Sequence, residues 1–262
     1  MTVPKQMTSS LVDIAGSVTS PVEKRLFAEY GAVFATTATP PPAIIFDSAG
    51  KVEAFQSSLS LSRAGFGDYE IQLQTDALGA LAAAASEIAD RGGSITARAA
   101  DAGGRSYGDT VRLWTRNVTR GLEHWQGLGQ ITPERAHSIR ELTPVEQVAA
   151  ILNVEETERI FFGTFFDRSI LYSVAAPGAS QHLSMLAFDV AEYEDREVDR
   201  VLARYGWYRT VPNDLPHFTY LGHDLDSLPG LGLRRIEHID GERVYDFWTP
   251  DIDRLLVSAG LE

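Results

Sequence analysis

One acidic residue constrains the fold of this chain strongly, because it stands inside an apolar segment. Asp189 lies in the run from Met185 to Val190. In a strand, alternation would place Ala187 beside Asp189 on one face and Phe188 on the other. A carboxylate on a buried strand is costly unless another group pairs with it. We therefore expect a fold that brings a partner to Asp189, and a divalent cation is one such partner.

Two histidines are placed to share that cation. His182 precedes the apolar run, and His217 begins a second short run directly after Pro216. The proline fixes its own φ and favours extended geometry at Leu215, so His217 should enter a strand in a fixed direction. Two neutral imidazoles and a carboxylate form a set that holds zinc and leaves the fourth position for water. The chain has no cysteine, so any metal must be held by histidines and carboxylates.

Each of these residues also has an ordinary structural use when it is considered alone. His182 and His217 would then be partly buried histidines, since a single histidine has many structural roles. Asp189 and Asp214 would be read as turn or cap residues. Their joint order along the chain is what favours a metal site.

Three separated motifs resemble the zinc D-Ala-D-Ala carboxypeptidase and dipeptidase family, of the VanY and VanX type. The first is Ser180-x-His182 followed by Ala187-x-Asp189, and the second is Asp214-x-x-His217-Phe218. The third is Gly104-Arg105-Ser106-Tyr107, which is similar to a Tyr-Arg-Ser run in the family. The motifs occur in the family's order, and the resemblance covers about residues 93 to 221.

The resemblance implies a role for each matched residue. His182, Asp189 and His217 would bind Zn²⁺, and Asp214, three residues before the second histidine, would be the catalytic base. Arg105 would hold a substrate carbonyl or carboxylate, and Ser180 would also contact substrate. The implied activity is hydrolysis of a peptide bond in peptidoglycan stem peptides, with D-Ala-D-Ala as the family's commonest substrate.

Two positions depart from the family pattern. Met185 stands where the family has a glycine between the first histidine and the aspartate. Asp214 stands where the base is usually glutamate, and its side chain is shorter by one methylene, roughly 1.5 Å. A catalytically weak or inactive zinc-containing module that binds peptidoglycan is therefore an alternative. A serine hydrolase centred on Ser180 is a weaker one, because no Gly-x-Ser-x-Gly motif is present.

The coarse pattern mixes helices and short strands without regular alternation, which is typical of an α+β fold. The resemblance implies a small, mainly antiparallel sheet with flanking helices and a Hedgehog-like core. Helices are predicted near residues 21–30, 52–59, 77–89, 106–125, 132–140, 143–152 and 194–205. Strands are predicted at 32–36, 43–46, 69–73, 94–100, 168–174, 185–190 and 217–221, with a hairpin turning at Asp240-Gly241. The predicted organisation is a flexible leader over 1–20, an N-terminal extension over 21–92 packed on the core, and a zinc peptidase core over 93–262 that includes the hairpin.

Charge and hydropathy restrict the partners. A net charge of -13 without a cluster of Lys and Arg argues against nucleic acid. No segment is long and apolar enough to predict a membrane span, and the N-terminus lacks the order of a signal peptide. We expect a monomer that acts on a stem peptide or D-Ala-D-Ala peptide. Its location would be periplasmic or secreted if a signal peptide has been removed, and cytoplasmic otherwise.

Overall fold

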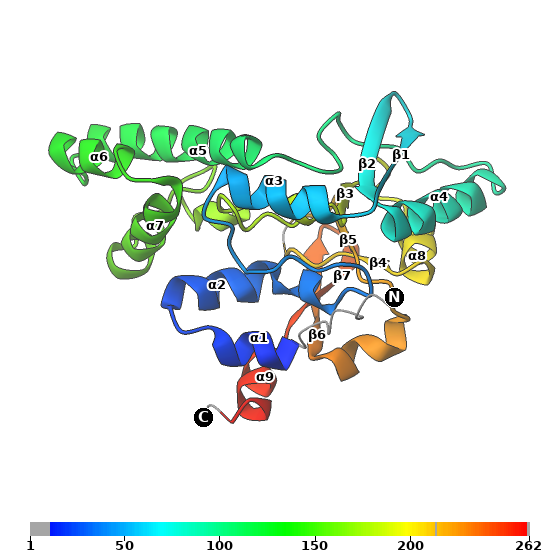
Figure 1. Cartoon of the computed structure of the whole chain (residues 1–262). Helices are drawn as coiled ribbons and strands as arrows, with labels where there is room; N and C mark the ends of the chain where they lie inside the picture. The colour runs from blue at the N-terminus through cyan, green and yellow to red at the C-terminus, as the bar shows by residue number, and fades with distance from the viewer. Residues whose placement is uncertain (1–10, 213, 261–262) are drawn as a thin grey trace.

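The computed structural model describes residues 11–212 and 214–260, and these form an α+β fold (Figure 1). Helices surround small antiparallel sheets, which confirms the coarse fold class predicted from the sequence. No helix within the described residues is long and apolar enough to cross a membrane.

A three-stranded antiparallel sheet lies at the centre of the molecule. It consists of β3 (Ala187–Asp189), β5 (His217–Tyr220) and β4 (Trp207–Tyr208), in the order β3-β5-β4. The register sets Asp189 opposite His217 and Phe188 opposite Phe218. Directly opposite residues share a face, so the polar pair faces one side of the sheet and the two phenylalanines face the other. The predicted alternation about Asp189 is confirmed.

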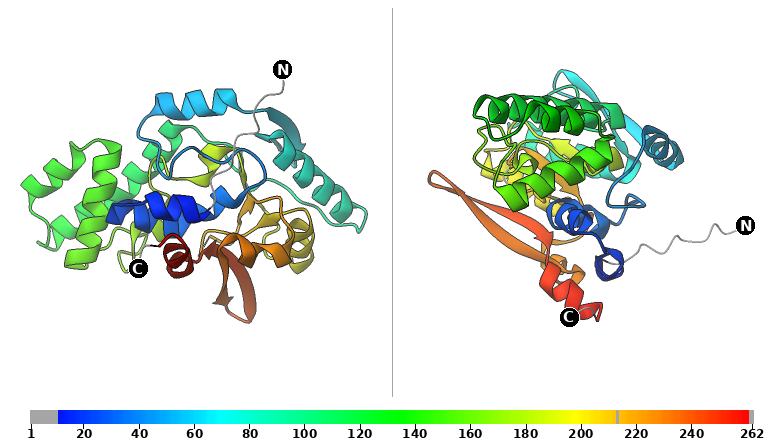
Figure 2. Two further views of the ribbon diagram at one scale, coloured as in Figure 1. Left: turned by 60° about the horizontal axis from the view of Figure 1, so that its bottom comes forward. Right: turned by 90° about the vertical axis from the view of Figure 1, so that its left-hand side faces the viewer.

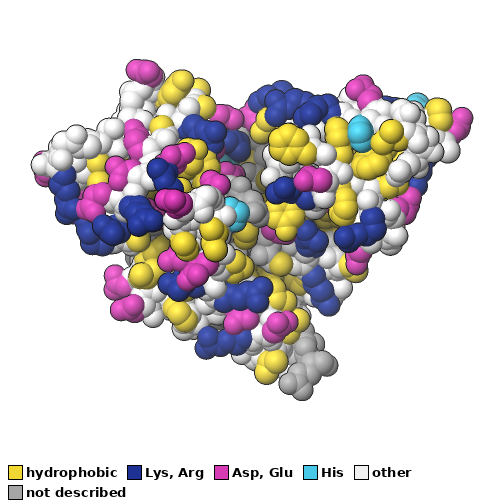
Figure 3. Space-filling view, turned by 180° about the vertical axis from the view of Figure 1, so that it is seen from behind, with side chains coloured by type: hydrophobic (Ala, Val, Ile, Leu, Met, Phe, Trp, Pro, Cys, Tyr) yellow, Lys and Arg dark blue, Asp and Glu magenta, His cyan; other side chains and the backbone are white. Residues whose placement is uncertain are grey.

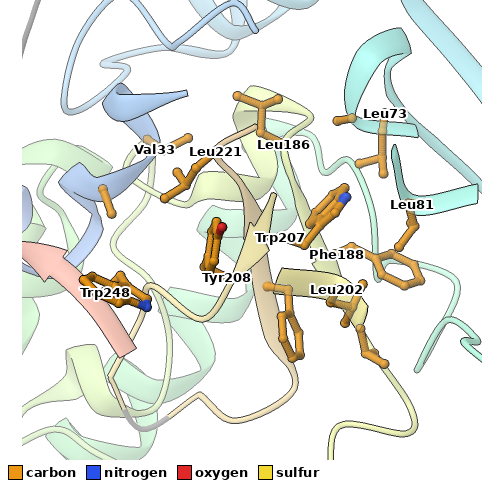
Figure 4. Close-up of a cluster of buried hydrophobic side chains, with 14 of the residues drawn as sticks. Val33, Leu73, Leu81, Leu186, Phe188, Leu202, Trp207, Tyr208, Leu221 and Trp248 are labelled. Atoms are coloured by element: carbon orange, nitrogen blue, oxygen red, sulfur yellow. The ribbon is translucent and has the colours of Figure 1, made fainter. Parts of the chain in front are cut away.

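The phenylalanine face of this sheet packs into the larger hydrophobic core. Figure 4 shows Phe188 and Trp207 among aliphatic side chains that include Leu81 and Leu202. Leu81 comes from α4 (Thr75–Ala89) and Leu202 from α8 (Arg196–Arg204). The core therefore draws on both sides of residue 92, where the sequence predicted the boundary between extension and core.

Two hairpins complete the β structure. The first joins β1 (Leu61–Phe66) to β2 (Tyr69–Gln74), and the second joins β6 (Leu233–Asp240) to β7 (Arg243–Pro250). The second hairpin was predicted, and its turn lies at residues 241 and 242, one residue later than expected. Gly241 has φ +60°, which a glycine adopts without cost. Figure 2 shows this hairpin projecting from the body of the molecule.

A helical region with its own core lies to one side of the sheet. It contains α5 (Tyr107–Gly127), α6 (Pro133–Arg140) and α7 (Pro144–Glu158), which appear at the left of Figure 1. Ser106, Thr132 and Thr143 cap the three helices with their side-chain oxygens. Pro133 and Pro144 occupy first helical positions, as the sequence predicted. A shorter helix, α3 (Ala49–Ser58), packs against α5.

The N-terminal region is more ordered than predicted. Residues 11–17 form α1 (Leu11–Ser17), so the predicted flexible leader is wrong there, and residues 1–10 lie outside the described part. Leu11 and Ala15 are buried, because apolar residues recur at helical spacing and α1 packs against α9 (Ile252–Ser258). The next helix, α2 (Pro21–Tyr30), agrees with the prediction and runs into the 3₁₀ helix η1 (Gly31–Ala35).

Several predicted strands are wrong. Residues 31–35 form η1, and Ile170–Tyr172 form the 3₁₀ helix η2. Residues 43–46 form no strand, and residues 94–100 contribute a single bridge between Ala97 and Val190. Short apolar runs do not distinguish a strand from a buried turn, because both hide the same side chains. Two further 3₁₀ helices are η3 (Gln181–Ser184) and η4 (Leu225–Leu231).

Candidate metal centre

The three predicted ligands come together on one face of the central sheet. Asp189 and His217 are cross-strand neighbours, and His182 reaches them from η3. Asp189 Oδ1 lies 3.3 Å from His182 Nε2 and 3.2 Å from His217 Nδ1. One donor atom from each residue lies within 4.8 Å of the others, so the group could hold a metal ion. Both histidines are buried, and the Asp189 side chain is 17% exposed.

Each imidazole makes a hydrogen bond through the nitrogen that points away from Asp189. This bond determines whether the nitrogen that faces Asp189 carries a proton or a lone pair. His182 Nδ1 lies 2.6 Å from the carbonyl oxygen of Gly103, and His217 Nε2 lies 2.8 Å from Gln181 Oε1. Both partners only accept hydrogen bonds, so these two nitrogens carry the protons. In the neutral imidazoles, the nitrogens that face Asp189 then hold lone pairs. Two lone pairs and a carboxylate oxygen converge on one place, which is the arrangement that a cation satisfies.

The protonation states favour the same interpretation. Burial lowers the pKa of His182, which outweighs the opposite effect of Asp189 and favours the neutral ring. Arg105 pairs with Asp189 at 2.9 Å, and this positive charge favours the ionised carboxylate. The donor set therefore pairs an ionised carboxylate with a neutral imidazole, as Zn²⁺ requires.

Gln181 fixes the orientation of His217. Its Nε2 donates to the carbonyl oxygen of Tyr30 at 2.8 Å, so Oε1 must face the histidine. The same Oε1 accepts from the hydroxyls of Thr210 and Thr219 at 3.0 and 2.5 Å. This network assigns Nδ1 of His217, and not Nε2, as the available ligand atom.

Arg105 lies immediately before α5 and contacts the same aspartate. Its Nη2 donates to Asp189 Oδ2 at 2.9 Å, and its Nε donates to the carbonyl oxygen of Asp101 at 3.1 Å. Gln56 ties this segment to the histidine turn by donating to the carbonyl oxygens of Arg105 and Leu183. Arg105 Nη1 has no hydrogen bond to any described residue. The guanidinium is therefore held in place with one nitrogen left for another group.

Asp214 lies in the turn that leads into β5. The backbone N–H of His217 donates to its carbonyl oxygen at 3.1 Å. Burial raises the pKa of Asp214; His217 acts against this effect and Asp189 adds to it. The side chain is nevertheless open to solvent, and this exposure weakens the rise in its pKa. A carboxyl whose pKa is raised toward neutrality is better suited to accept a proton than an ordinary one.

A buried arginine that the sequence did not single out fixes this turn. Arg209 Nε donates to the carbonyl oxygen of Leu215 at 2.8 Å, and Nη2 donates to that of Tyr193 at 2.7 Å. Its Nη1 pairs with Asp199 at 2.6 Å, and the guanidinium lies 4.4 Å from the ring centre of Phe218. Every side-chain nitrogen of Arg209 is thus hydrogen-bonded, and Nε ties the segment before His217 to this fixed side chain.

Met185 occupies the backbone position where the resembling family has glycine. Its φ is +58° and its ψ is +30°, in the left-handed region that costs a residue with a side chain about 1 kcal/mol. The side chain is buried and packs against Gly104, beside Arg105, where an added Cβ would collide with the Met185 sulfur. The turn between His182 and Asp189 therefore has the left-handed backbone geometry that glycine favours, although the residue is methionine.

A pocket of about 300 Å³ opens onto the three ligands. Its lining includes every site residue predicted from the sequence: Arg105, Ser180, His182, Asp189, Asp214 and His217. Ser180 is buried at the start of η3, and among the described residues no histidine is hydrogen-bonded to its hydroxyl, which disfavours a serine nucleophile.

Sequence reasoning missed the residues that support the ligands. Gly103 acts through its backbone carbonyl, Gln181 through its side-chain amide, and Arg209 by donating to the backbone carbonyl of Leu215. Such contacts leave no motif in the sequence. The position of Gln181 next to His182 is the one available signal, since a polar residue beside a ligand on a buried turn needs a partner.

No family model, curated protein or solved structure matches this chain. The resemblance to the zinc peptidase family and the Hedgehog-like core therefore stay predictions.

Proposed function

We propose that this protein is a zinc-dependent peptidase that cleaves a peptide bond in peptidoglycan stem peptides, acting as a D-Ala-D-Ala carboxypeptidase. The single observation that carries the proposal is the convergence of two imidazole lone pairs and the Asp189 carboxylate on one place in a pocket. The order of the three motifs along the chain gives the substrate class, through the family that they resemble.

His182 Nε2, Asp189 and His217 Nδ1 would hold the zinc. Bound Zn²⁺ supplies Lewis-acid chemistry, which polarises a carbonyl group and makes water a stronger acid. Asp214 lines the same pocket, and its carboxylate accepts a proton from the attacking water and returns it to the leaving amine. Its raised pKa suits both transfers.

Arg105 and Ser180 would position the substrate. Arg105 is fixed through Nε and Nη2, so its Nη1 can donate to a substrate carbonyl or carboxylate without further ordering of the side chain. The hydroxyl of Ser180 adds a hydrogen-bonding group on the pocket wall beside the ligand turn.

Zinc content and hydrolysis test the proposal directly. Protein purified with ample metal should carry one zinc per chain and release D-Ala from stem peptides, and a chelator should abolish release. Asp214→Asn should keep the zinc and lower the rate by about a hundredfold or more, because the general base is lost while the shape is kept. Absence of zinc from metal-replete protein would overturn the proposal.

A zinc-containing module that binds peptidoglycan without cleaving it is the second candidate. Two observations favour it: Asp214 has a shorter side chain than glutamate, and Arg105 is already paired with Asp189. Asp214→Glu separates the two candidates. If the parent cleaves no stem peptide and this variant does not create the activity, binding without cleavage becomes the function.

A further inference from the structure

The charge of the pocket is opposite to that of the protein. The whole chain has a net charge of -13, yet among the described residues three arginines and only two aspartates line the pocket. Figure 3 shows one face of the molecule hollowed near its middle, with basic side chains on both sides of the hollow. A pocket that gathers positive charge in an acidic protein raises the local concentration of anions.

Arg116 is the arginine in this pocket with no partner. It follows Thr110 and Leu113 along the pocket side of α5, roughly 9 Å from Thr110 along the helix axis. Its neighbours on the helix are engaged, since Arg112 pairs with Asp109 and Arg120 donates to the carbonyl oxygen of Thr164. Arg116 makes no hydrogen bond or ion pair with any described residue.

The position of Arg116 also works against the stability of α5. Arg112, Arg116 and Arg120 are four residues apart, and like charges at this spacing repel each other on a helix. Local helix stability therefore gives no reason for a cation at residue 116, whereas an anionic ligand in the pocket would.

A second arginine approaches the pocket from the segment beside β3. The backbone N–H of Arg98 donates to the carbonyl oxygen of Asp189 at 3.0 Å, which anchors the residue to the ligand strand. Its guanidinium lies 5.7 Å from the ring centre of Tyr193 and forms no ion pair with the described residues. Arg98 thus adds positive charge near the metal ligands without neutralising any of them.

We propose that Arg116 is a further substrate-binding residue of this pocket and that it binds a carboxylate of the peptide. The inference rests on the proposed function and adds a specificity residue to it. Leu113, Leu171 and Val174 also line the pocket, which suits a peptide with small apolar side chains. Arg98 assists through its charge.

Equilibrium binding of matched peptides tests the inference without requiring cleavage. The probes are acetyl-D-Glu-D-Ala-D-Ala, its D-Gln counterpart, and the C-terminal amide of each, all bound to zinc-loaded Asp214→Asn protein. Replacing D-Glu by D-Gln removes a side-chain carboxylate, and amidation of the C-terminus removes the terminal carboxylate. We expect one of these changes to weaken binding by about tenfold or more, as for loss of a charged hydrogen bond.

Arg116→Gln should abolish that tenfold difference, and Arg112→Gln, one helical turn earlier and outside the pocket, should retain it. Equal affinity of the starting protein for all four peptides would overturn the inference. It would also be overturned if Arg116→Gln kept the full difference in affinity, or if Arg98→Gln lost the difference while Arg116→Gln kept it. Charge-selective binding by a protein that cleaves nothing would uphold it and refute the peptidase. Cleavage without a preference for the charged peptides would uphold the peptidase and refute the inference.

Discussion

Two acidic residues withdrawn from solvent, Asp189 at the central sheet and Glu155 in the helical region, are satisfied in opposite ways. Glu155 accepts hydrogen bonds from the backbone N–H groups of Phe162 and Ile170 at 2.9 and 2.8 Å, and from the hydroxyl of Ser169 at 2.5 Å. Asp189 receives a hydrogen bond from Arg105, but its other oxygen faces two imidazole nitrogens whose protons point away.

The difference separates a carboxylate that holds the fold together from one that could bind a cation. The donors around Glu155 are complete and belong to the segment that follows α7, so the acid ties that segment to the helix. The surroundings of Asp189 are incomplete and open onto a pocket. Full satisfaction of a buried polar group indicates a structural role, and converging acceptors are typical of a site that could hold a cation.

The largest expected effect is the loss of zinc from Asp189→Asn. Removal of a supporting contact costs about ten- to a hundredfold in metal affinity, so removal of a charged ligand should cost more than about a hundredfold. The metal-free variant should be as stable as the metal-free parent, within about 1 kcal/mol, because the asparagine N–H₂ can donate to an imidazole lone pair. Zinc titration and urea unfolding measure the two quantities.

Asp101→Asn is the matched control, because it neutralises another carboxylate near Arg105 that is no ligand. Full zinc affinity in Asp189→Asn would remove Asp189 from the metal centre. A large loss of stability in the metal-free variant would make Asp189 a structural acid like Glu155.

Glu155→Ala should show the converse behaviour. It leaves two buried N–H groups and a hydroxyl without an acceptor, so the free energy of unfolding should fall by about 3 kcal/mol while zinc affinity stays the same. Denaturant unfolding measures the first quantity and zinc titration the second. Glu156→Ala, at an exposed position on the same helix, should change neither. If Glu155→Ala released zinc, the two acids would not be independent.

Gln181→Ala tests the support of the metal centre. The variant removes the acceptor that holds the proton on His217 Nε2, and zinc affinity should fall by about ten- to a hundredfold. Gln74 is a suitable control, because it is buried and bonds to the carbonyl oxygen of Ser184 without touching a ligand. Equal losses of zinc affinity in Gln74→Ala and Gln181→Ala would mean that general loosening, and not the tautomer of His217, causes the effect.

The smallest expected effect is a change in pH dependence. Burial raises the pKa of Glu155 above its ordinary value of 4.5, so the folded protein holds this proton more tightly than the unfolded chain. The contribution of Glu155 to stability is therefore greatest below about pH 4.5 and falls as the pH rises through the raised pKa. The stability of Glu155→Gln should not show this decrease with pH. Unfolding free energies of the variant and the parent at several pH values measure the difference. A parent and variant with parallel profiles would contradict the assignment.

The sequence predicted the helices better than the strands. Pro133 and Pro144, each after a capping threonine, mark helix starts through local chemistry, and the structure places α6 and α7 there. The run at residues 168–174 carries no such local signal, and its burial in the second core does not require strand pairing. The leader prediction failed because α1 is stabilised by α9, from the other end of the chain.

The grouping of the three candidate metal ligands was predictable and their environment was not. His182, Asp189 and His217 are chemically distinctive residues in a recognisable order, and strand register then brings two of them together. The proton positions depend on Gly103 and Gln181, and the partner of Arg105 became evident only from the fold. The metal-binding role of the three candidate ligands, and the roles of Asp214, Arg105 and Ser180, stay predictions.

All side-chain nitrogens of Arg209 are hydrogen-bonded, and this has a thermodynamic consequence for ligand binding. A shift of the segment before His217 would remove the hydrogen bond between Leu215 and Arg209, a buried cation that Asp199 and Tyr193 hold in place, so this part of the pocket is preorganised before any ligand arrives. Adaptation to ligands of different shape then falls to other parts of the lining, such as the exposed Tyr172 and Ser173. Ligands should therefore differ in affinity mainly through the ordering entropy of those parts.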